Sequence, residues 1–210
     1  MKLAVGRELE SVQRRIDELV SAGAAARIWR RDATFWGGDG ARQRSVAQRL
    51  GWLDAAEQMR AELPELRTFA GDVAASGITD AILLGMGGSS LAAEVLRAGI
   101  AENRLASHHR GVRLHVLDTT DPRTIAAVTE AIDPAHALFI VSSKSGGTIE
   151  AMALFEHFYA VVEAARVAHP GERFVAITDP GTSLETLARD RAFRRVFLNP
   201  PDIGGRYSAL

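Results

Sequence analysis

The sequence predicts an α/β protein, a three-layer α/β/α sandwich around a five-stranded parallel sheet, preceded by a helical segment. From Ile78 onward, short apolar runs alternate with helical stretches, which is the pattern of β-α-β units with a buried parallel sheet. Before that point, apolar residues recur at helical spacing. Parallel neighbours need right-handed crossovers, so helices must cover both faces of the sheet. We therefore expect a helical segment over residues 1–76 and the sandwich domain over residues 77–210.

Helices are expected throughout the first segment. An amphipathic helix should end near Gly23, because apolar residues recur between charged neighbours up to that point. Three glycines break the pattern within residues 27–40, and helical patterning resumes over residues 42–75. An interruption is expected at Pro64, because proline lacks the backbone N–H that a helix interior needs.

Five apolar runs are expected to form the strands of the sheet. They are AILL at residues 81–84, VRLHVL at 112–117, ALFIVS at 137–142, RFVAIT at 173–178 and RVFL at 195–198. In open parallel sheets, ligands bind beyond the carboxyl ends of the strands, where loops enter helix N-termini. The loops after the first, third and fifth runs are therefore the places to look for chemistry.

The first of these loops is GMGGSS, from Gly85 to Ser90, and a helix is expected over residues 91–98. A glycine turn that delivers backbone N–H groups and hydroxyls to a helix N-terminus suits an anion. A tight turn with Ser89 or Ser90 as an ordinary N-cap is an alternative. A dinucleotide fingerprint is another, but it would need glycine at position 90 and an acidic residue about 20 positions later, where Asp118 comes rather late.

The second loop is SSKSGGT, from Ser142 to Thr148, and it opens a helix expected over residues 149–166. Hydroxyl and amide donors around a helix N-terminus suit the oxygens of a phosphate monoester. Lys144 would neutralise such a phosphate, or it would be an ordinary solvated lysine. The spacing is not that of a Walker loop, so nucleoside triphosphate chemistry is not expected.

The third loop is NPPDIGGRYS, from Asn199 to Ser208. Its prolines restrict the backbone, and its two glycines allow the backbone to approach a ligand closely. Arg206 is permanently charged and presents a fork of donors, so it is suited to stabilise an oxyanion that develops during a reaction. A salt bridge or a solvated loop position is the structural alternative.

Composition excludes several classes of function. Lys and Arg number 25 against 26 Asp and Glu, so no excess positive charge would attract nucleic acid or an anionic membrane. The absence of cysteine excludes disulfides and thiolate chemistry. The six histidines have no metal-ligand spacing, and we expect neither a metal nor a cofactor. Without a signal peptide or an apolar stretch of membrane-spanning length, a cytoplasmic location is expected.

Taken together, the three loops resemble those of the phosphoglucose isomerase family in order and in spacing. Residues 204–208, GGRYS, are the most specific part, whereas the glycine loop alone would be a weak signal. The resemblance covers essentially the whole chain and is to the first of the family's two sugar isomerase (SIS) domains, which have a flavodoxin-like fold. It is closest to the bacterial forms, including those fused to a transaldolase.

The resemblance implies a role for individual residues. The residues that would bind the phosphosugar are Gly88, Ser89, Ser143, Lys144, Ser145, Thr148 and Gly205. Arg206 would be the catalytic oxyanion stabiliser. Many family members have threonine in place of Ser145 and a bulkier or hydroxylated residue in place of Gly146 or Gly147. Glu150, in the first turn of the following helix, would orient hydroxyls and would not be the base.

The implied reaction is the interconversion of glucose 6-phosphate and fructose 6-phosphate through an enediolate, which needs a general base and an oxyanion stabiliser. The family takes its base, a glutamate, and its ring-opening histidine and lysine from segments beyond position 210. The chain is therefore expected to be an N-terminal fragment that binds hexose 6-phosphate with little activity alone. The full-length enzyme is expected to be a homodimer.

Two other functions are weighed against this one. SIS domains also occur in noncatalytic sugar-phosphate sensors, but the helical segment has no basic recognition helix, and GGRYS points to the enzyme. A nucleotide-binding oxidoreductase is the third candidate. Protection of the folded chain against heat would distinguish them: NAD should protect an oxidoreductase, and a hexose phosphate should protect a phosphosugar-binding protein.

Overall fold

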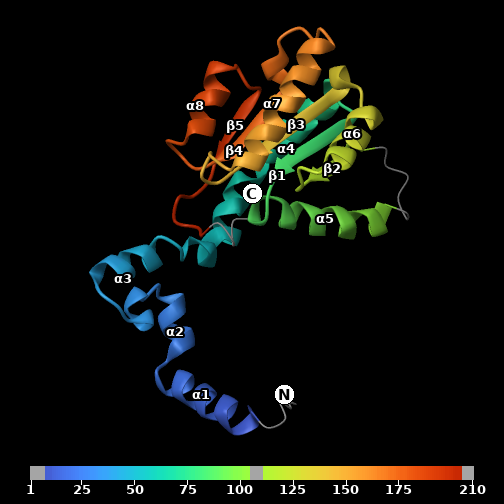
Figure 1. The fold of residues 1–210 in the computed structure, drawn as a ribbon. Coiled ribbons are helices and arrows are strands. Elements are labelled where there is room, and N and C mark those ends of the chain that lie inside the picture. Colours follow the sequence, from blue (N-terminus) through green and yellow to red (C-terminus); the bar gives the residue numbers. More distant parts are fainter. Residues whose placement is uncertain (1–7, 105–110, 205–210) are drawn as a thin grey trace.

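The computed structural model of the chain describes residues 8–104 and 111–204 (Figure 1). The α-helices are α1 (Leu9–Ser21), α2 (Ala24–Trp29), α3 (Gly40–Ala47), α4 (Ala55–Ala75), α5 (Gly88–Arg104), α6 (Pro122–Ala131), α7 (Ile149–Ala164) and α8 (Ser183–Asp190). The strands are β1 (Asp80–Gly85), β2 (Arg113–Leu117), β3 (Ala137–Ser142), β4 (Phe174–Thr178) and β5 (Arg195–Leu198). Short 3-10 helices are η2 (Ala33–Trp36), η3 (Gly51–Asp54), η4 (Pro134–His136) and η5 (Pro170–Arg173).

Helices α1 to α3 form an arm that extends away from the sheet (Figure 1). As expected, α1 ends just before Gly23, which takes a φ of +63° and turns the chain into α2. The side chains of Asp32 and Asp39 cap η2 and α3 by accepting hydrogen bonds from backbone N–H groups. No residue of these three helices is buried. The apolar stripe of α1 therefore lies at the surface.

The helical region 42–75 is interrupted, but not at Pro64. The break falls at residues 48–54, and α4 runs continuously through the proline. Proline removes one helical hydrogen bond, which would have reached the carbonyl of Arg60. Both residues are exposed, so water can bond that carbonyl in place of the missing N–H. The expected interruption is wrong because the position is solvated.

The sheet has five parallel strands in the order β2-β1-β3-β4-β5. The five predicted strands agree with the observed ones to within one residue at either end. This is the flavodoxin-like order, in which the direction of winding reverses between β1 and β3. The predicted fold class is confirmed, and the switch point places the loops after β1 and β3 side by side.

Helices α6, α7 and α8 pack on one face of the sheet, around a core of phenylalanines. The Phe139 ring of β3 stacks on Phe158 of α7 and on Phe174 of β4, each with its ring centroid 5.0 Å away. All three side chains are fully buried. Burial of each such side chain contributes about 1.5–3 kcal/mol, so this face carries much of the stability.

Helix α4 packs on the opposite face. Phe69 and Val73 lie against Leu138 of β3 and Val175 of β4. Helix α4, the last helix before β1, therefore forms part of the second helical layer of the sandwich. Helix α5 contacts β1 and β2. Helices on both faces complete the three layers.

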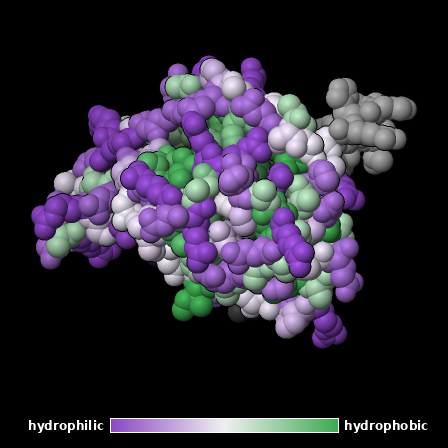
Figure 2. Space-filling model, turned by 90° about the horizontal axis from the view of Figure 1, so that it is seen from above, coloured by the Kyte–Doolittle hydropathy of each residue, from purple (hydrophilic) through white to green (hydrophobic). Residues whose placement is uncertain are grey.

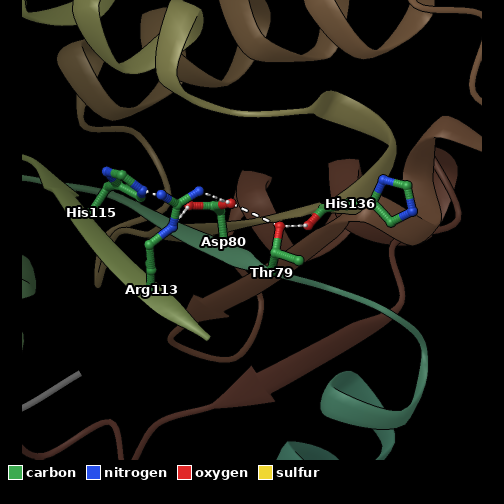
Figure 3. Close-up of polar contacts among 5 residues, drawn as sticks. All are labelled: Thr79, Asp80, Arg113, His115 and His136. Carbon is green, nitrogen blue, oxygen red and sulfur yellow. Dashed lines mark hydrogen bonds and ion pairs between the residues drawn. The ribbon is translucent and has the colours of Figure 1, made fainter. Parts of the chain in front are cut away.

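A polar network joins the strands at the amino-terminal edge of the sheet (Figure 3). Asp80, only 1% exposed, accepts hydrogen bonds from Arg113 at 2.9 Å, from His115 at 2.8 Å and from the Thr79 hydroxyl at 2.8 Å. The backbone N–H of Thr79 donates to the carbonyl of His136, 2.8 Å away. The network thus connects the beginnings of β1, β2 and β3, on the edge remote from the candidate loops.

The network also changes the acidity of Asp80. Burial acts to raise the pKa of this carboxyl, but the hydrogen bonds from Arg113, His115 and Thr79 outweigh burial and hold the pKa below its ordinary value of 3.8. A pKa lower in the folded state than in the unfolded state stabilises the fold above the unfolded pKa. That stabilisation is lost as the pH falls toward the folded pKa.

The surface in Figure 2 is mostly hydrophilic, with hydrophobic residues in small separate patches. The exposed apolar residues of α5 include Leu91, Val95 and Leu96, each 63–65% exposed.

Within residues 8–104 and 111–204, no helix combines the length and the apolar character needed to cross a bilayer.

The Asp80 network gives a prediction for stability against pH. Asp80→Asn should lower the free energy of unfolding at pH 7 by about 1.5–3 kcal/mol, the range for hydrogen bonds to a charged group. The difference from the unmodified chain should shrink below a pH of about 4, because protonation of Asp80 then removes the same interactions. Urea unfolding at several pH values measures both effects.

Asp133→Asn is the matched control for this experiment. Asp133 also bonds a histidine, His136, at 2.8 Å, but its side chain is 60% exposed, so its loss should barely change stability. Equal effects of the two substitutions, or a difference at Asp80 that does not vary with pH, would contradict the assignment.

Candidate functional site

The candidate site is a crevice at the carboxyl-terminal edge of the sheet. Gly85 of β1 pairs with Ser142 of β3, so the loops that follow these strands begin next to each other. Beside them opens a cleft of about 570 Å³. The residues that line it are Gln48, Arg49, Lys144, Pro201, Asp202, Ile203 and Gly204. The cleft therefore lies between the loop after β3, the loop after β5 and the end of the helical segment.

The loop after β3 forms a tight turn that presents hydroxyls at the start of α7. The hydroxyls of Ser143 and Thr148 are 2.9 Å apart, and the N–H of Gly146 donates to the carbonyl of Ser143 at 3.1 Å. The hydroxyl of Thr178 fixes that same carbonyl at 2.7 Å. Ser145 lies in the turn with its side chain exposed. Three predicted phosphate ligands, Ser143, Ser145 and Thr148, are thus brought together.

The N-terminus of α7 is open to an anion. Thr148 is the N-cap residue, yet its side chain makes no capping hydrogen bond, because its hydroxyl faces Ser143. The first N–H groups of a helix have no partner within the helix and carry a partial positive charge. Glu150 lies in this first turn with its side chain exposed. The N–H groups of Gly147 and Thr148 lie 3.4 and 3.5 Å from the hydroxyls of Ser145 and Ser143, so the backbone donors open to an anion are those of the first turn of α7.

Lys144 is held at the edge of the cleft. Its ammonium forms an ion pair with Asp179, which follows β4, and both side chains are largely buried, at 21% and 17% exposed. The carbonyl of Pro201 lies 3.5 Å from the same nitrogen. Lys144 is therefore not an ordinary solvated lysine. It joins three of the loops that surround the crevice.

The loop after β1 contributes a compact turn. Gly87 has a φ of +55°, and Gly88 is already the first residue of α5, which thus begins three residues earlier than predicted. Ser90 is buried and its hydroxyl donates to the carbonyl of Gly87 at 3.1 Å; because α5 already begins at Gly88, neither Ser89 nor Ser90 is the N-cap residue. Ser89 is 9% exposed, in the first turn of α5 beside the loop after β3. The two functional candidates, Gly88 and Ser89, lie at the switch point of the sheet.

The loop after β5 is anchored to the helical segment. The N–H of Gly51 donates to the carbonyl of Asp202 at 2.9 Å, and Leu50 forms an antiparallel bridge with Ile203. The Asp202 carboxylate pairs with Arg31 at 3.3 Å. Gly205 and Arg206, predicted to flank the reacting carbons, lie outside the described residues.

The loop after β4 also borders the candidate site, although no role was predicted for it from the sequence. Asp179 pairs with Lys144, and the hydroxyl of Ser183 donates to the carbonyl of Gly146 at 2.8 Å. Thr182 packs directly against Gly146. The signal was available, because TDPGTS follows a predicted strand and opens a helix, as the other two loops do.

Three polar atoms around the crevice are buried without a hydrogen-bond partner in the described structure. They belong to Ser142, Asp179 and Asn199, at or just after the ends of β3, β4 and β5. Side chains alternate along strands, so these residues continue the rows of Leu138, Val175 and Phe197, which face α4. Buried polar atoms are nearly always bonded, and exceptions in a native fold are frequent at functional sites.

Comparison with known proteins identifies relatives of the chain. Phosphoglucose isomerase is the family whose sequence model matches, over residues 52–210. A glucose-6-phosphate isomerase from Thermus thermophilus is 33% identical over 180 residues, which cover 81% of this chain and 40% of the relative. The enzyme of that name from Rubrobacter xylanophilus is 32% identical over 145 residues, or 66% of this chain and 33% of the relative.

Solved structures agree. The crystal structure of a hypothetical protein from Thermus thermophilus superimposes with a TM-score of 0.68 at 28% identity, over 92% of this chain and 43% of that one. A glucose-6-phosphate isomerase from Chlamydia trachomatis gives a TM-score of 0.59 at 28% identity, over 74% and 29%. The chain spans about two fifths or less of the length of the curated relatives above.

The site geometry distinguishes the two glycines of the SSKSGGT loop. Gly146 has a φ of +68°, and a Cβ placed there would lie 2.5 Å from Cβ of Thr182. A Cβ on Gly147 would have no neighbour within 4 Å. Of these two glycines, Gly147 has room for a side chain and Gly146 does not.

We therefore expect Gly146→Ala to lower the free energy of unfolding by roughly 1–3 kcal/mol, from left-handed strain and the clash together. Gly147→Ala, one position away, is the matched control and should leave stability nearly unchanged. Chemical denaturation of both variants measures the difference. Equal destabilisation by the two substitutions would show that the loop conformation differs from the one described.

Proposed function

Because the chain belongs to the phosphoglucose isomerase family, we propose that it is the phosphosugar-binding part of a glucose-6-phosphate isomerase. In this proposal, the phosphate of a hexose 6-phosphate binds to the turn at the start of α7, and the sugar extends toward Gly88 and Ser89. The single observation that carries the proposal is the uncapped N-terminus of α7, with the hydroxyls of Ser143, Ser145 and Thr148 around it.

The physical chemistry of the turn supports a phosphate monoester as the ligand. A phosphate at neutral pH carries close to two negative charges and three acceptor oxygens. Backbone N–H groups at a helix start and hydroxyl donors match those oxygens, and hydrogen bonds to a charged acceptor are about twice as strong as neutral ones. Lys144 belongs to the same loop, and its ammonium, paired with Asp179, lines the neighbouring cleft.

The isomerisation transfers a proton between C2 of the aldose and C1 of the ketose through an enediolate. A base removes the proton beside the carbonyl, the oxygen develops negative charge, and the proton returns to the neighbouring carbon. In the proposal, Arg206 stabilises that oxygen, with Gly205 allowing close approach of the backbone. The family resemblance supports these two roles.

The described residues offer binding groups, and the family resemblance gives Glu150, the carboxylate at the start of α7, an orienting role and not that of the base. Asp179 is paired with Lys144, and Asp202 is paired with Arg31. The histidines within residues 8–104 and 111–204 lie in β2, in η4, on α7 and before η5, away from the crevice. We therefore propose that this chain binds the phosphosugar and does not turn it over unaided.

A noncatalytic sensor is the weaker alternative. The match to the enzyme family covers residues 52–210, including all three loops of the crevice. GGRYS, the part of the resemblance with a catalytic role, would have no function in a protein that only senses a sugar phosphate.

Ligand-induced stabilisation tests binding. Fructose 6-phosphate at about 100 times its dissociation constant should stabilise the native chain by about 2.7 kcal/mol, which corresponds to a rise in Tm of roughly 5–10 °C. Fructose without phosphate should have no effect. Lys144→Ala should weaken binding roughly 10- to 100-fold, since it removes a hydrogen bond between charged groups.

Lys2→Ala is the matched control, because Lys2 is the other lysine of the chain and lies far from the loop in sequence. It should bind as the unmodified chain does. A folded chain whose Tm is indifferent to both sugar phosphate and inorganic phosphate would overturn the proposed site.

Turnover is tested separately. With fructose 6-phosphate as substrate, the purified 210-residue chain should form no glucose 6-phosphate above the rate of an Arg206→Ala variant. Turnover that depends on Arg206 would mean that the chain itself contains the base, and it would refute the proposal that it only binds.

A further inference from the structure

Asp179 is joined to Lys144 by two independent contacts. Its carboxylate pairs with the ammonium, and its backbone N–H donates to the carbonyl of Lys144 at 3.1 Å. The two residues are 35 positions apart, at the ends of neighbouring strands. The loop after β4 therefore fixes both the backbone and the side chain of this lysine.

Desolvation makes the Lys144–Asp179 ion pair a weak source of stability for the fold. Its side chains are 21% and 17% exposed, and the second carboxylate oxygen of Asp179 is buried with no partner in the described structure. Removing charges from water and leaving an acceptor unbonded offsets much of the attraction between them. A purely structural role for the pair would be better served by apolar residues, so a functional reason for it is favoured.

The presence of lysine, and not arginine, at position 144 also favours a functional role for the ion pair. The chain contains 23 arginines and only two lysines, and one of the two is Lys144. An arginine fork tends to bind a carboxylate with two parallel hydrogen bonds. An ammonium has three donors, of which one serves Asp179 and a second points to the carbonyl of Pro201 at 3.5 Å. A third donor is left for the cleft that Lys144 lines.

We propose that Asp179 is a positioning residue for the phosphosugar site. It holds the Lys144 ammonium at the rim of the cleft, oriented so that its remaining N–H meets the anionic ligand. The inference rests on the proposed function. Without Asp179, the lysine would regain much of its rotamer freedom, which it would have to lose again on binding.

Competition between Asp179 and phosphate for Lys144 would have the opposite effect on binding. Asp179 is negatively charged, so if it merely competed with phosphate for Lys144, its neutralisation would strengthen binding. Positioning predicts weaker binding and competition predicts tighter binding. The sign of the effect therefore decides between them.

The test is a double-mutant cycle on the 210-residue chain, with calorimetric titration of fructose 6-phosphate. Asp179→Asn keeps the shape of the side chain and the backbone N–H, and it should weaken binding about 10-fold, which is about 1.4 kcal/mol. In a Lys144→Met background the same substitution should change affinity less than about twofold, because a residue that acts through Lys144 has nothing left to position.

Three outcomes would overturn the inference. Tighter binding by Asp179→Asn would show competition, and equal weakening in both backgrounds would show an effect on the fold in general. Unchanged affinity would show that Lys144 needs no positioning. Failure of the unmodified chain to bind would instead remove the proposed function.

The ion pair itself can be followed without a ligand. In a chain labelled with ¹⁵N-lysine, the ammonium of Lys144 should give a signal protected from solvent exchange, identified by its absence in Lys144→Met. Asp179→Asn should abolish its protection, and persistence of a protected signal would refute the pairing on which the inference depends.

Discussion

The parallel register of β1, β3 and β4 is the constraint from which the site follows. Gly85, Ser142 and Ile177 lie in one row across these strands, so the three loops that follow leave the sheet at the same level. The packing there is close. A Cβ on Gly85 would lie 3.0 Å from the carbonyl of Ser89 and 3.2 Å from that of Ser142. A larger residue would force the loops after β1 and β3 apart.

Both edges of the sheet contain buried polar groups. At the amino edge, the buried carboxylate of Asp80 is surrounded by donors. At the carboxyl edge, Ser142, Asp179 and Asn199 each have a buried polar atom without a partner in the described structure. Fold stability favours satisfied groups, and natural proteins depart from that rule mainly where function requires it. Nε of Arg173, directly before β4 at the amino edge, is also buried without a partner in the described structure, so these atoms alone do not show which edge binds a ligand.

Sequence reasoning reached the strands and the loops because both have strong local signals. The five apolar runs located the sheet to within one residue, and the glycines and hydroxyls marked two of the loops that border the crevice. Prediction from the sequence failed where solvent exposure or a tertiary contact determines the structure. Pro64 is tolerated because the position is exposed. Asp179 could not be recognised from its own surroundings in the sequence, because its partner Lys144 lies 35 residues earlier. The role expected for Arg206 falls outside the described residues and stays a prediction.

The contact between the helical segment and the loop after β5 links folding to the shape of the cleft. Gly51 bonds Asp202 and Leu50 bridges Ile203, although the partners are 151 and 153 positions apart in the sequence. Closing so long a loop costs conformational entropy, and the intervening sheet brings the two partners close together. The carbonyl of Pro201, which lies within reach of Lys144, belongs to the anchored loop. Docking of the helical segment therefore sets one wall of the cleft and, through Pro201, the surroundings of its lysine.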